Sequence, residues 1–90
     1  MLLFIFSYPI NVLNEAVGKT IKDLRKQKGI SQEKLADAID SHQVYISEIE
    51  RGLKMPSLMI LNDMAKCFGI TLTELVSIIE KNSTDNPQTR

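Results

Sequence analysis

Residues 31–52 constrain the fold of this chain more strongly than any other segment. Ser31 can cap the free amides at the start of a helix, and helical spacing of apolar residues follows it. Residues 40–42 are small or polar and predict a tight corner. Ile46 and Ile49 then give a second helix its buried side. The segment is therefore predicted to form two short helices folded across a corner, with polar side chains facing outward from the second.

Helical signals continue on both sides of this pair. Apolar residues recur at helical spacing from residue 14, so we predict a first helix over residues 14–28. Ser57 predicts the start of a fourth helix, and Thr71 and Glu74 form a capping box for a fifth helix over about residues 72–81. The glycines that follow helical stretches predict where helices end; they are Gly29, Gly52 and Gly69. Together these signals predict a compact all-α domain of five helices.

The chain divides into three parts by composition. We predict an apolar N-terminal arm over residues 1–13, a helical domain over residues 14–81 and a polar tail over residues 82–90. The apolar start is too short for a membrane span, which takes about 20 residues. Three interpretations of it remain open: an arm that packs on a partner subunit, a clamp over the domain's own core, or an extension from an upstream translation start. We favour an arm that something holds in place.

Composition excludes several classes of protein. The 90 residues carry 11 basic and 11 acidic side chains, so the net charge of zero argues against a general nucleic-acid coat. Cys67 is the only cysteine and His42 the only histidine, which excludes a disulfide framework and a metal site and suggests the cytoplasm. No nucleophile with an adjacent base is evident, so we expect no enzyme and no cofactor.

Five motifs carry a family resemblance: Ile21-Lys-Asp-Leu-Arg25, Gly29-Ile-Ser-Gln-Glu-Lys-Leu-Ala36, Tyr45-Ile-Ser-Glu-Ile-Glu-Arg-Gly52, Pro56-Ser-Leu58 and Phe68-Gly-Ile70. In these motifs the sequence resembles the XRE, or lambda-repressor-like, helix-turn-helix transcription regulators. The resemblance covers about residues 14 to 80, and around residues 42–52 the sequence is similar to the controller proteins of restriction-modification systems. It implies the lambda-repressor-like five-helix fold and DNA binding. It also implies a largely hidden ion pair between Arg25 and Glu50, and contact of Gln32 with a DNA phosphate.

Two residues in the corner depart from the family pattern. Asp40 stands where glycine is usual, and Ser41 stands where a buried aliphatic residue is usual. Aspartate tolerates a left-handed backbone better than most residues, so we predict that the turn survives at modest cost. The serine is expected to loosen the packing between the two helices.

An α-helix fits the DNA major groove, where each base pair presents a distinct pattern of donors, acceptors and methyl groups. Gln43 is predicted to bond adenine and Val44 to contact a thymine methyl. His42 either contacts a phosphate or base edge or is simply solvated. Ser47 is a candidate for a phosphate contact. Tyr45 either directs its hydroxyl at the DNA backbone or only packs inside.

Other side chains are candidates for contacts with the DNA backbone. Arg51 and Lys54 flank the end of the reading helix and either neutralise phosphates or remain solvated. Gln32 either bonds a phosphate or is an ordinary exposed helix start. Glu48 would repel a phosphate unless it faces a cytosine amino group.

One small helix reads too few base pairs to select a site in a genome, so a homodimer on a palindromic operator is predicted. The predicted dimer seam is a stripe of the fifth helix; the alternative is that this wide stripe only faces the core of its own chain. The seam residues are Leu72, Val76 and Ile79.

A protein-interaction module on the same fold, resembling an antitoxin or a partner of another regulator, is the main rival function. RNA polymerase is a further candidate partner through Glu33 and Asp37, for which solvated helix charge is the simpler interpretation.

Overall fold

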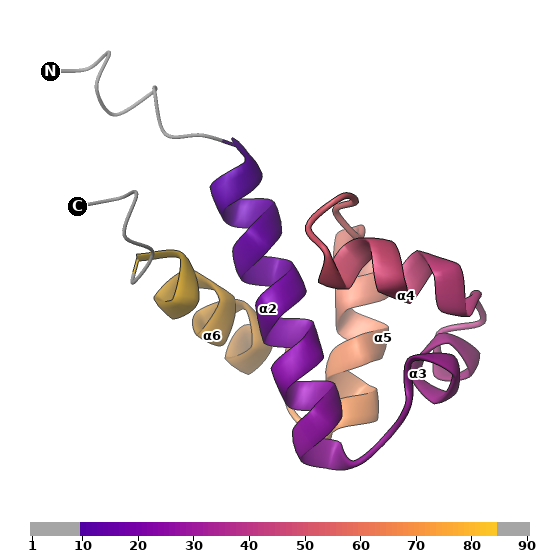
Figure 1. Cartoon of the computed structure of the whole chain (residues 1–90). Helices are drawn as coiled ribbons and strands as arrows, with labels where there is room; N and C mark the ends of the chain where they lie inside the picture. The colour runs from indigo at the N-terminus through magenta and orange to yellow at the C-terminus, as the bar shows by residue number, and fades with distance from the viewer. Residues whose placement is uncertain (1–9, 85–90) are drawn as a thin grey trace, which may run out of the picture.

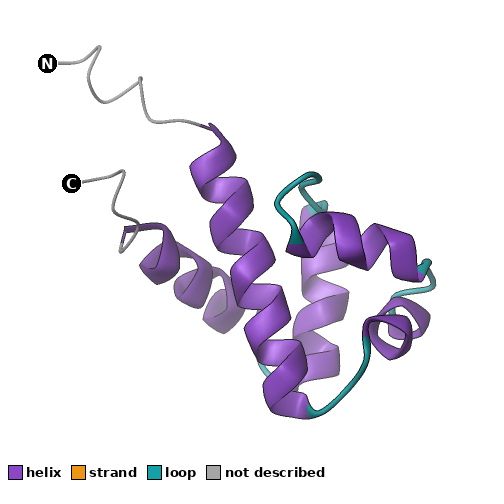
Figure 2. Ribbon diagram, viewed as in Figure 1, coloured by secondary structure: helices purple, strands orange, loops and turns teal. Residues whose placement is uncertain are grey.

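Helical spacing of apolar side chains runs through the part of the chain that the structure, a computed structural model, describes, namely residues 10–84. Over that range the chain consists of helices joined by short loops (Figure 1; Figure 2). This confirms the predicted all-α architecture of five helices. Within the described residues the helices are α2 (Ile10–Lys28), α3 (Gln32–Ala38), α4 (Gln43–Glu50), α5 (Leu58–Phe68) and α6 (Leu72–Thr84).

The helix ends follow the signals in the sequence. Ser31 and Ser57 each accept a hydrogen bond from the backbone N–H three residues further on, at 3.0 and 3.2 Å. The capping box is complete, because the Thr71 hydroxyl accepts from the Glu74 N–H at 3.0 Å and the Glu74 carboxylate accepts from the Thr71 N–H at 2.8 Å. The predicted terminal glycines adopt a left-handed backbone conformation; they are Gly29, Gly52 and Gly69.

Helix α2 lies at the centre of the fold. It contacts α6 on one side and α4 on the other, and α5 packs behind it (Figure 1). The buried faces of these helices and of α3 share one apolar core. Its most deeply buried aliphatic side chains are Ile21, Leu35, Ile46, Ile49, Met64 and Leu75.

Helices α2 and α4 approach each other closely at Gly18. A Cβ atom at this position would lie 2.8 Å from the carbonyl oxygen of Glu50 and closer still to that of Ile49. Both are backbone atoms at the end of α4, so they cannot move aside as a flexible side chain would. The absence of a side chain at Gly18 therefore sets how closely the end of α4 lies against α2.

Two predicted helix boundaries need correction. The first helix begins at Ile10 and not at residue 14, because Val12 is fully buried and extends the packed face by another turn. The last helix continues to Thr84 and not to residue 81, because Ser83 is buried and the Asn82 amide donates to the Thr20 hydroxyl at 2.6 Å. The polar residues after 81 therefore begin as packed helix.

The predicted N-terminal arm overlaps α2 from residue 10, and its residues 1–9 lie outside the described residues. Residues 85–90 of the predicted tail also lie outside them. None of the helices within residues 10–84 combines the length and the apolar character needed to cross a membrane.

Candidate nucleic-acid interface

Helix α4 presents its N-terminal turn to solvent. Ile46 and Ile49 are fully buried and fix which side of the helix faces the core. His42, Gln43 and Val44 are therefore exposed on the opposite side. His42 is the N-cap residue but makes no side-chain capping bond, so its imidazole is not committed to the helix start. The turn that is predicted to read bases is accessible.

The corner before α4 has the backbone that the sequence predicts. Asp40 has a φ of 57°, the one positive φ at a non-glycine position within residues 10–84. The backbone N–H of Ser41 donates to the Ala36 carbonyl at 2.8 Å, which closes the end of α3. The turn survives as predicted, with Asp40 in a left-handed conformation.

The ion pair between Arg25 and Glu50 is present and largely hidden from water. Arg25 Nε donates to Glu50 Oε2 at 2.6 Å and Arg25 Nη2 donates to Oε1 at 3.1 Å, a two-pronged contact. The Glu50 side chain is only 3% exposed. The hydrogen bond to Glu50, with their charge attraction, raises the pKa of Arg25 although burial acts in the opposite direction.

This pair joins α2 to the end of α4, and it also reaches the start of α3. Arg25 Nη1 donates to the carbonyl oxygen of Ile30 at 2.9 Å, in the loop between α2 and α3. Three segments that are separate in sequence are thereby held by one guanidinium group. The orientation of α4 is fixed at its C-terminal end, close to Gly18.

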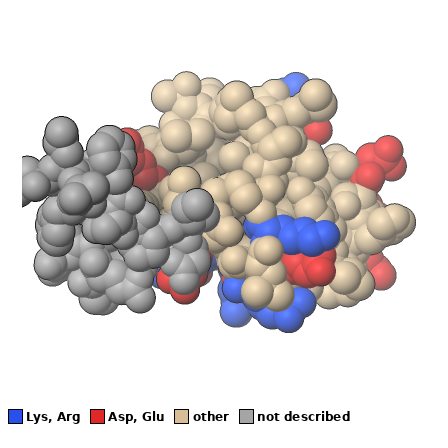
Figure 3. Space-filling view, turned by 90° about the horizontal axis from the view of Figure 1, so that it is seen from above, with Lys and Arg blue, Asp and Glu red and all other residues tan. Residues whose placement is uncertain are grey.

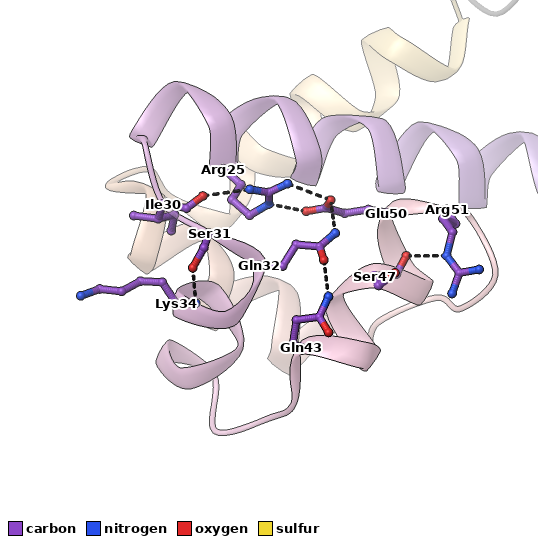
Figure 4. A network of polar contacts seen from close by, with 9 residues as sticks. All are labelled: Arg25, Ile30, Ser31, Gln32, Lys34, Gln43, Ser47, Glu50 and Arg51. Atoms are coloured by element: carbon purple, nitrogen blue, oxygen red, sulfur yellow. Dashed lines mark hydrogen bonds and ion pairs between the residues drawn. The ribbon is translucent and has the colours of Figure 1, made fainter.

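A chain of hydrogen bonds runs from this ion pair to the exposed turn of α4 (Figure 4). Gln32 Nε2 donates to Glu50 Oε1 at 2.9 Å, and Gln43 Nε2 donates to Gln32 Oε1. Sequence reasoning missed this contact, although Gln32 and Gln43 are the first residues of two helices packed together. Each amide nitrogen carries two hydrogens, so Gln43 retains one donor hydrogen and its carbonyl oxygen for another partner.

The C-terminal end of α4 is flanked by cations. Arg51 is exposed and its Nε donates to the Ser47 carbonyl at 3.3 Å. Lys54 Nζ lies 3.6 Å from Glu48 Oε1, so its charge is partly compensated within the chain. Glu48 therefore has a partner that the sequence did not indicate.

A polar groove continues from Arg51 along α2. The side chains that line it include Lys22 and Lys26, together with Lys19, which pairs with Asp23 at 2.9 Å. The lining also includes Glu15, Asp23 and Glu50, so the groove that joins the end of the reading helix to α2 carries side chains of both charges.

The remaining predicted residues differ in exposure. Ser47 and Tyr45 are half-buried, and the ring of Tyr45 packs against the core. On α6, Val76 is 42% exposed, Leu72 is half-buried, and Ile79 is 5% exposed and belongs to the core of its own chain. Ile79 thus offers little surface to a second copy.

Within residues 10–84, no group of three or more His, Cys, Asp or Glu side chains is arranged to hold a metal ion.

The helix-turn-helix family HTH_3 matches residues 21–75, which span α3, α4 and α5 together with the C-terminal part of α2 and the first residues of α6. The chain is 42% identical over 73 residues to the control protein C.MunI of a Mycoplasma species, covering 80% of this chain and 99% of that protein. It is 38% identical over 60 residues to the control protein C.BamHI of Bacillus amyloliquefaciens, covering 66% and 74% of the two chains.

The fold is also similar to solved structures. The restriction-modification controller protein C.Esp1396I, solved as a tetramer in complex with its natural 35 base-pair operator, superposes with a TM-score of 0.70 at 28% identity. That comparison covers 79% of this chain and 93% of the other. The clp gene regulator ClgR from Corynebacterium glutamicum gives a TM-score of 0.77 at 27% identity, covering 86% and 80% of the two chains.

Proposed function

Because the chain belongs to the HTH_3 helix-turn-helix family, we propose that it is a sequence-specific transcription regulator that binds a palindromic operator as a homodimer. The observation that carries this proposal is the position of Gln43. It lies on the exposed first turn of α4, and Gln32 holds its amide while leaving a donor and an acceptor for a partner. That pair matches N7 and N6 of adenine in the major groove.

The rest of the interface supplies affinity and position. We propose that Val44 contacts a thymine methyl and that His42 and Ser47 contact the DNA backbone or a base edge. The second amide hydrogen of Gln32 is available for a phosphate at the N-terminal end of α3. Arg51 and Lys54 are proposed to neutralise phosphates beside the C-terminal end of α4. We assign Tyr45 a packing role, with its hydroxyl near the DNA backbone.

What is known of similar proteins supports this proposal. C.Esp1396I is a restriction-modification controller protein that was solved with its operator, and C.MunI and C.BamHI are named control proteins. The partners that we propose are double-stranded DNA and a second copy of the chain, both of which the protein meets in the cytoplasm. Contact with RNA polymerase through the exposed Glu33 and Asp37 is a further proposal that operator binding does not require.

Selection of bound fragments from a random DNA pool tests the proposal. We expect enrichment of two inverted half-sites with centres about 34 Å apart on one face of the duplex, as two copies of α4 require. We also expect the logarithm of the binding constant to fall linearly with the logarithm of the salt concentration. Enrichment of no sequence, together with absence of salt-dependent retention on heparin, would overturn it and favour a protein-interaction module.

A further inference from the structure

The hydrogen-bond chain that ends at Gln43 has a fixed direction, which is set at Glu50 (Figure 4). Arg25 pairs with the Glu50 carboxylate, and the Glu50 side chain is only 3% exposed. An ionised carboxylate accepts hydrogen bonds but cannot donate them. Gln32 must therefore turn its amide nitrogen toward Glu50, and its Nε2 does donate to Oε1 at 2.9 Å.

The same direction passes from Gln32 to Gln43. Because the Gln32 nitrogen is directed at Glu50, its Oε1 is the atom that meets Gln43, and a carbonyl oxygen can only accept. Gln43 therefore donates from Nε2, since the reversed amide would place two oxygen atoms against each other. The buried carboxylate thus determines which groups of the exposed Gln43 amide remain for a partner, namely Oε1 and one N–H.

These two groups match an adenine whose amino group is unmodified. In the proposed contact, Gln43 Oε1 accepts from adenine N6 and the N–H donates to N7. The amino group has two hydrogens: one bonds the opposite thymine, and the other points into the major groove. A methyl group on N6 of a paired adenine replaces the hydrogen in the groove, because the other is needed for pairing. It removes the donor that Gln43 Oε1 requires and puts a carbon atom in its place.

Gln43 cannot adapt to this methyl group by turning its amide. Exchanging the oxygen and the nitrogen would break the bond to Gln32 and bring two acceptors together. Gln32 cannot follow, because its own nitrogen is held by Glu50. The next residue, Val44, is 61% exposed but apolar, so its side chain offers no replacement hydrogen bond.

Non-specific attraction to DNA offers little compensation for a lost base contact. The chain carries 11 basic and 11 acidic side chains, so its net charge is zero. Seen from above, the described part of the surface is mostly uncharged and shows no continuous basic area (Figure 3). Selectivity must then come largely from contacts with base edges, of which the Gln43 contact is one.

We propose that the first turn of α4 senses the methylation state of its operator, and that N6-methyladenine at the position read by Gln43 prevents tight binding. This inference rests on the proposed function, because it requires that Gln43 reads adenine. It adds the chemical class of the preferred ligand, duplex DNA with an unmethylated adenine in each half-site. It also makes the methylation of that adenine a means of regulating occupancy of the operator.

Fluorescence anisotropy with two matched operators tests the proposal. The first is the operator selected from the random pool, and the second carries N6-methyladenine in one half-site, at the adenine for which Gln43→Ala abolishes the preference. We expect the wild type to bind the methylated operator about 10- to 100-fold more weakly, as the loss of a two-pronged base contact implies. A third operator, methylated at an adenine where Gln43→Ala has no effect, is the control and should bind as the unmethylated one does.

Variants of the hydrogen-bond chain assign the effect to its residues. Gln43→Ala should bind the methylated and unmethylated operators equally. Gln32→Ala releases the Gln43 amide, so the ratio of the two affinities should fall toward one. Any phosphate contact of Gln32 affects both operators alike and cancels in this ratio. Lys54→Ala is the control and should keep the wild-type ratio while it weakens binding to both. Far-UV circular dichroism shows that each variant is folded.

The possible failures are distinguishable. A wild type that prefers adenine at this position but binds the methylated operator equally well would overturn the inference and leave the proposed function intact. The inference would also be overturned by a methylation effect that persists in Gln43→Ala, or by a Gln43→Ala variant whose base preferences are unchanged. Failure of the random pool to yield any operator would refute the proposed function and this inference together.

Discussion

At the scale of single residues, the amide of Gln43 combines exposure with a fixed position. Its amide donates a hydrogen bond to Gln32, and the Gln32 amide donates one to Glu50. Its position therefore depends on the buried ion pair that Glu50 forms. A side chain ordered before binding loses less conformational freedom when it meets its partner. The network therefore favours Gln43 as the residue that discriminates bases.

We predict that Gln43→Ala abolishes the preference at one base position of each half-site. The loss of a two-pronged contact with a base costs about 1–3 kcal/mol of discrimination. Binding to the selected operator and to variants changed at each position, measured by fluorescence anisotropy, gives the preference. Lys54→Ala is the control and should weaken binding to all these DNAs alike. Equal loss on every DNA for Gln43→Ala would contradict the base-reading role.

Glu48 limits the charge that the chain presents to DNA. Its carboxylate lies near Lys54, and both side chains are partly exposed. We predict that Glu48→Gln strengthens binding to all DNA sequences by roughly 2- to 5-fold, because it frees the ammonium group and removes a repulsion from phosphates. The salt dependence of binding should become steeper.

The double variant with Lys54→Ala identifies the cause. If Glu48 acts mainly through Lys54, the gain in affinity should shrink when Lys54 is absent. A drop in affinity for Glu48→Gln that is confined to operators with a cytosine at one position would instead assign Glu48 to a base contact. The same anisotropy titrations, repeated at several salt concentrations, separate these outcomes.

At the scale of elements, α4 depends on the rest of the fold for its existence and direction. A helix of eight residues is marginal in isolation. It is held by two buried isoleucines, by the ion pair to α2 and by its close approach to α2 at Gly18. Changes on α2 are thus expected to alter how α4 meets DNA.

We predict that Gly18→Ala lowers the free energy of unfolding by about 1–3 kcal/mol, although alanine favours helix formation. The added Cβ would overlap the carbonyl oxygens of Ile49 and Glu50, so the end of α4 must move away from α2. Urea denaturation measures the loss. Lys19→Ala, an exposed change on the same helix, is the control and should have little effect. Unchanged stability in Gly18→Ala would show that the two helices separate without cost.

At the scale of the whole molecule, the sequence predicts those features that depend only on neighbouring residues, such as helix caps and turns. The caps at Ser31 and Ser57, the box at Thr71 and the left-handed Asp40 all depend on residues a few positions away, and all are present. The ion pair between Arg25 and Glu50 joins residues 25 positions apart and was expected only from the family resemblance.

Features that depend on contacts between distant segments could not be predicted in this way. The start of α2 at Ile10 and the end of α6 at Thr84 depend on packing between the two ends of the domain. The contact between Gln32 and Gln43 depends on how α3 and α4 cross. The exposure of Met59 depends on where α5 packs. Periodicity gives a helix a buried face but does not say which partner covers it.

The two ends of the domain are joined by a partly buried polar contact between α2 and α6. Thr20 Oγ1 accepts from Asn82 Nδ2 at 2.6 Å and donates to the Ala16 carbonyl at 2.7 Å. We predict that Thr20→Val and Asn82→Ala each lower the free energy of unfolding, and that a double-mutant cycle gives a coupling of about 1 kcal/mol. The reason is that Thr20→Val leaves the Asn82 amide without this acceptor.

Urea denaturation of the four proteins in the cycle provides the measurement, and Thr73→Val, an exposed change on α6, is the control with little expected effect. Additive losses would mean that residues beyond 81 are not coupled to α2 through this contact. A measurable coupling would place them within the cooperative unit that also holds α4, because α2 contacts both α6 and α4. Shortening the chain after residue 81 should then weaken DNA binding in parallel with stability, although no residue removed lies near Gln43 in sequence.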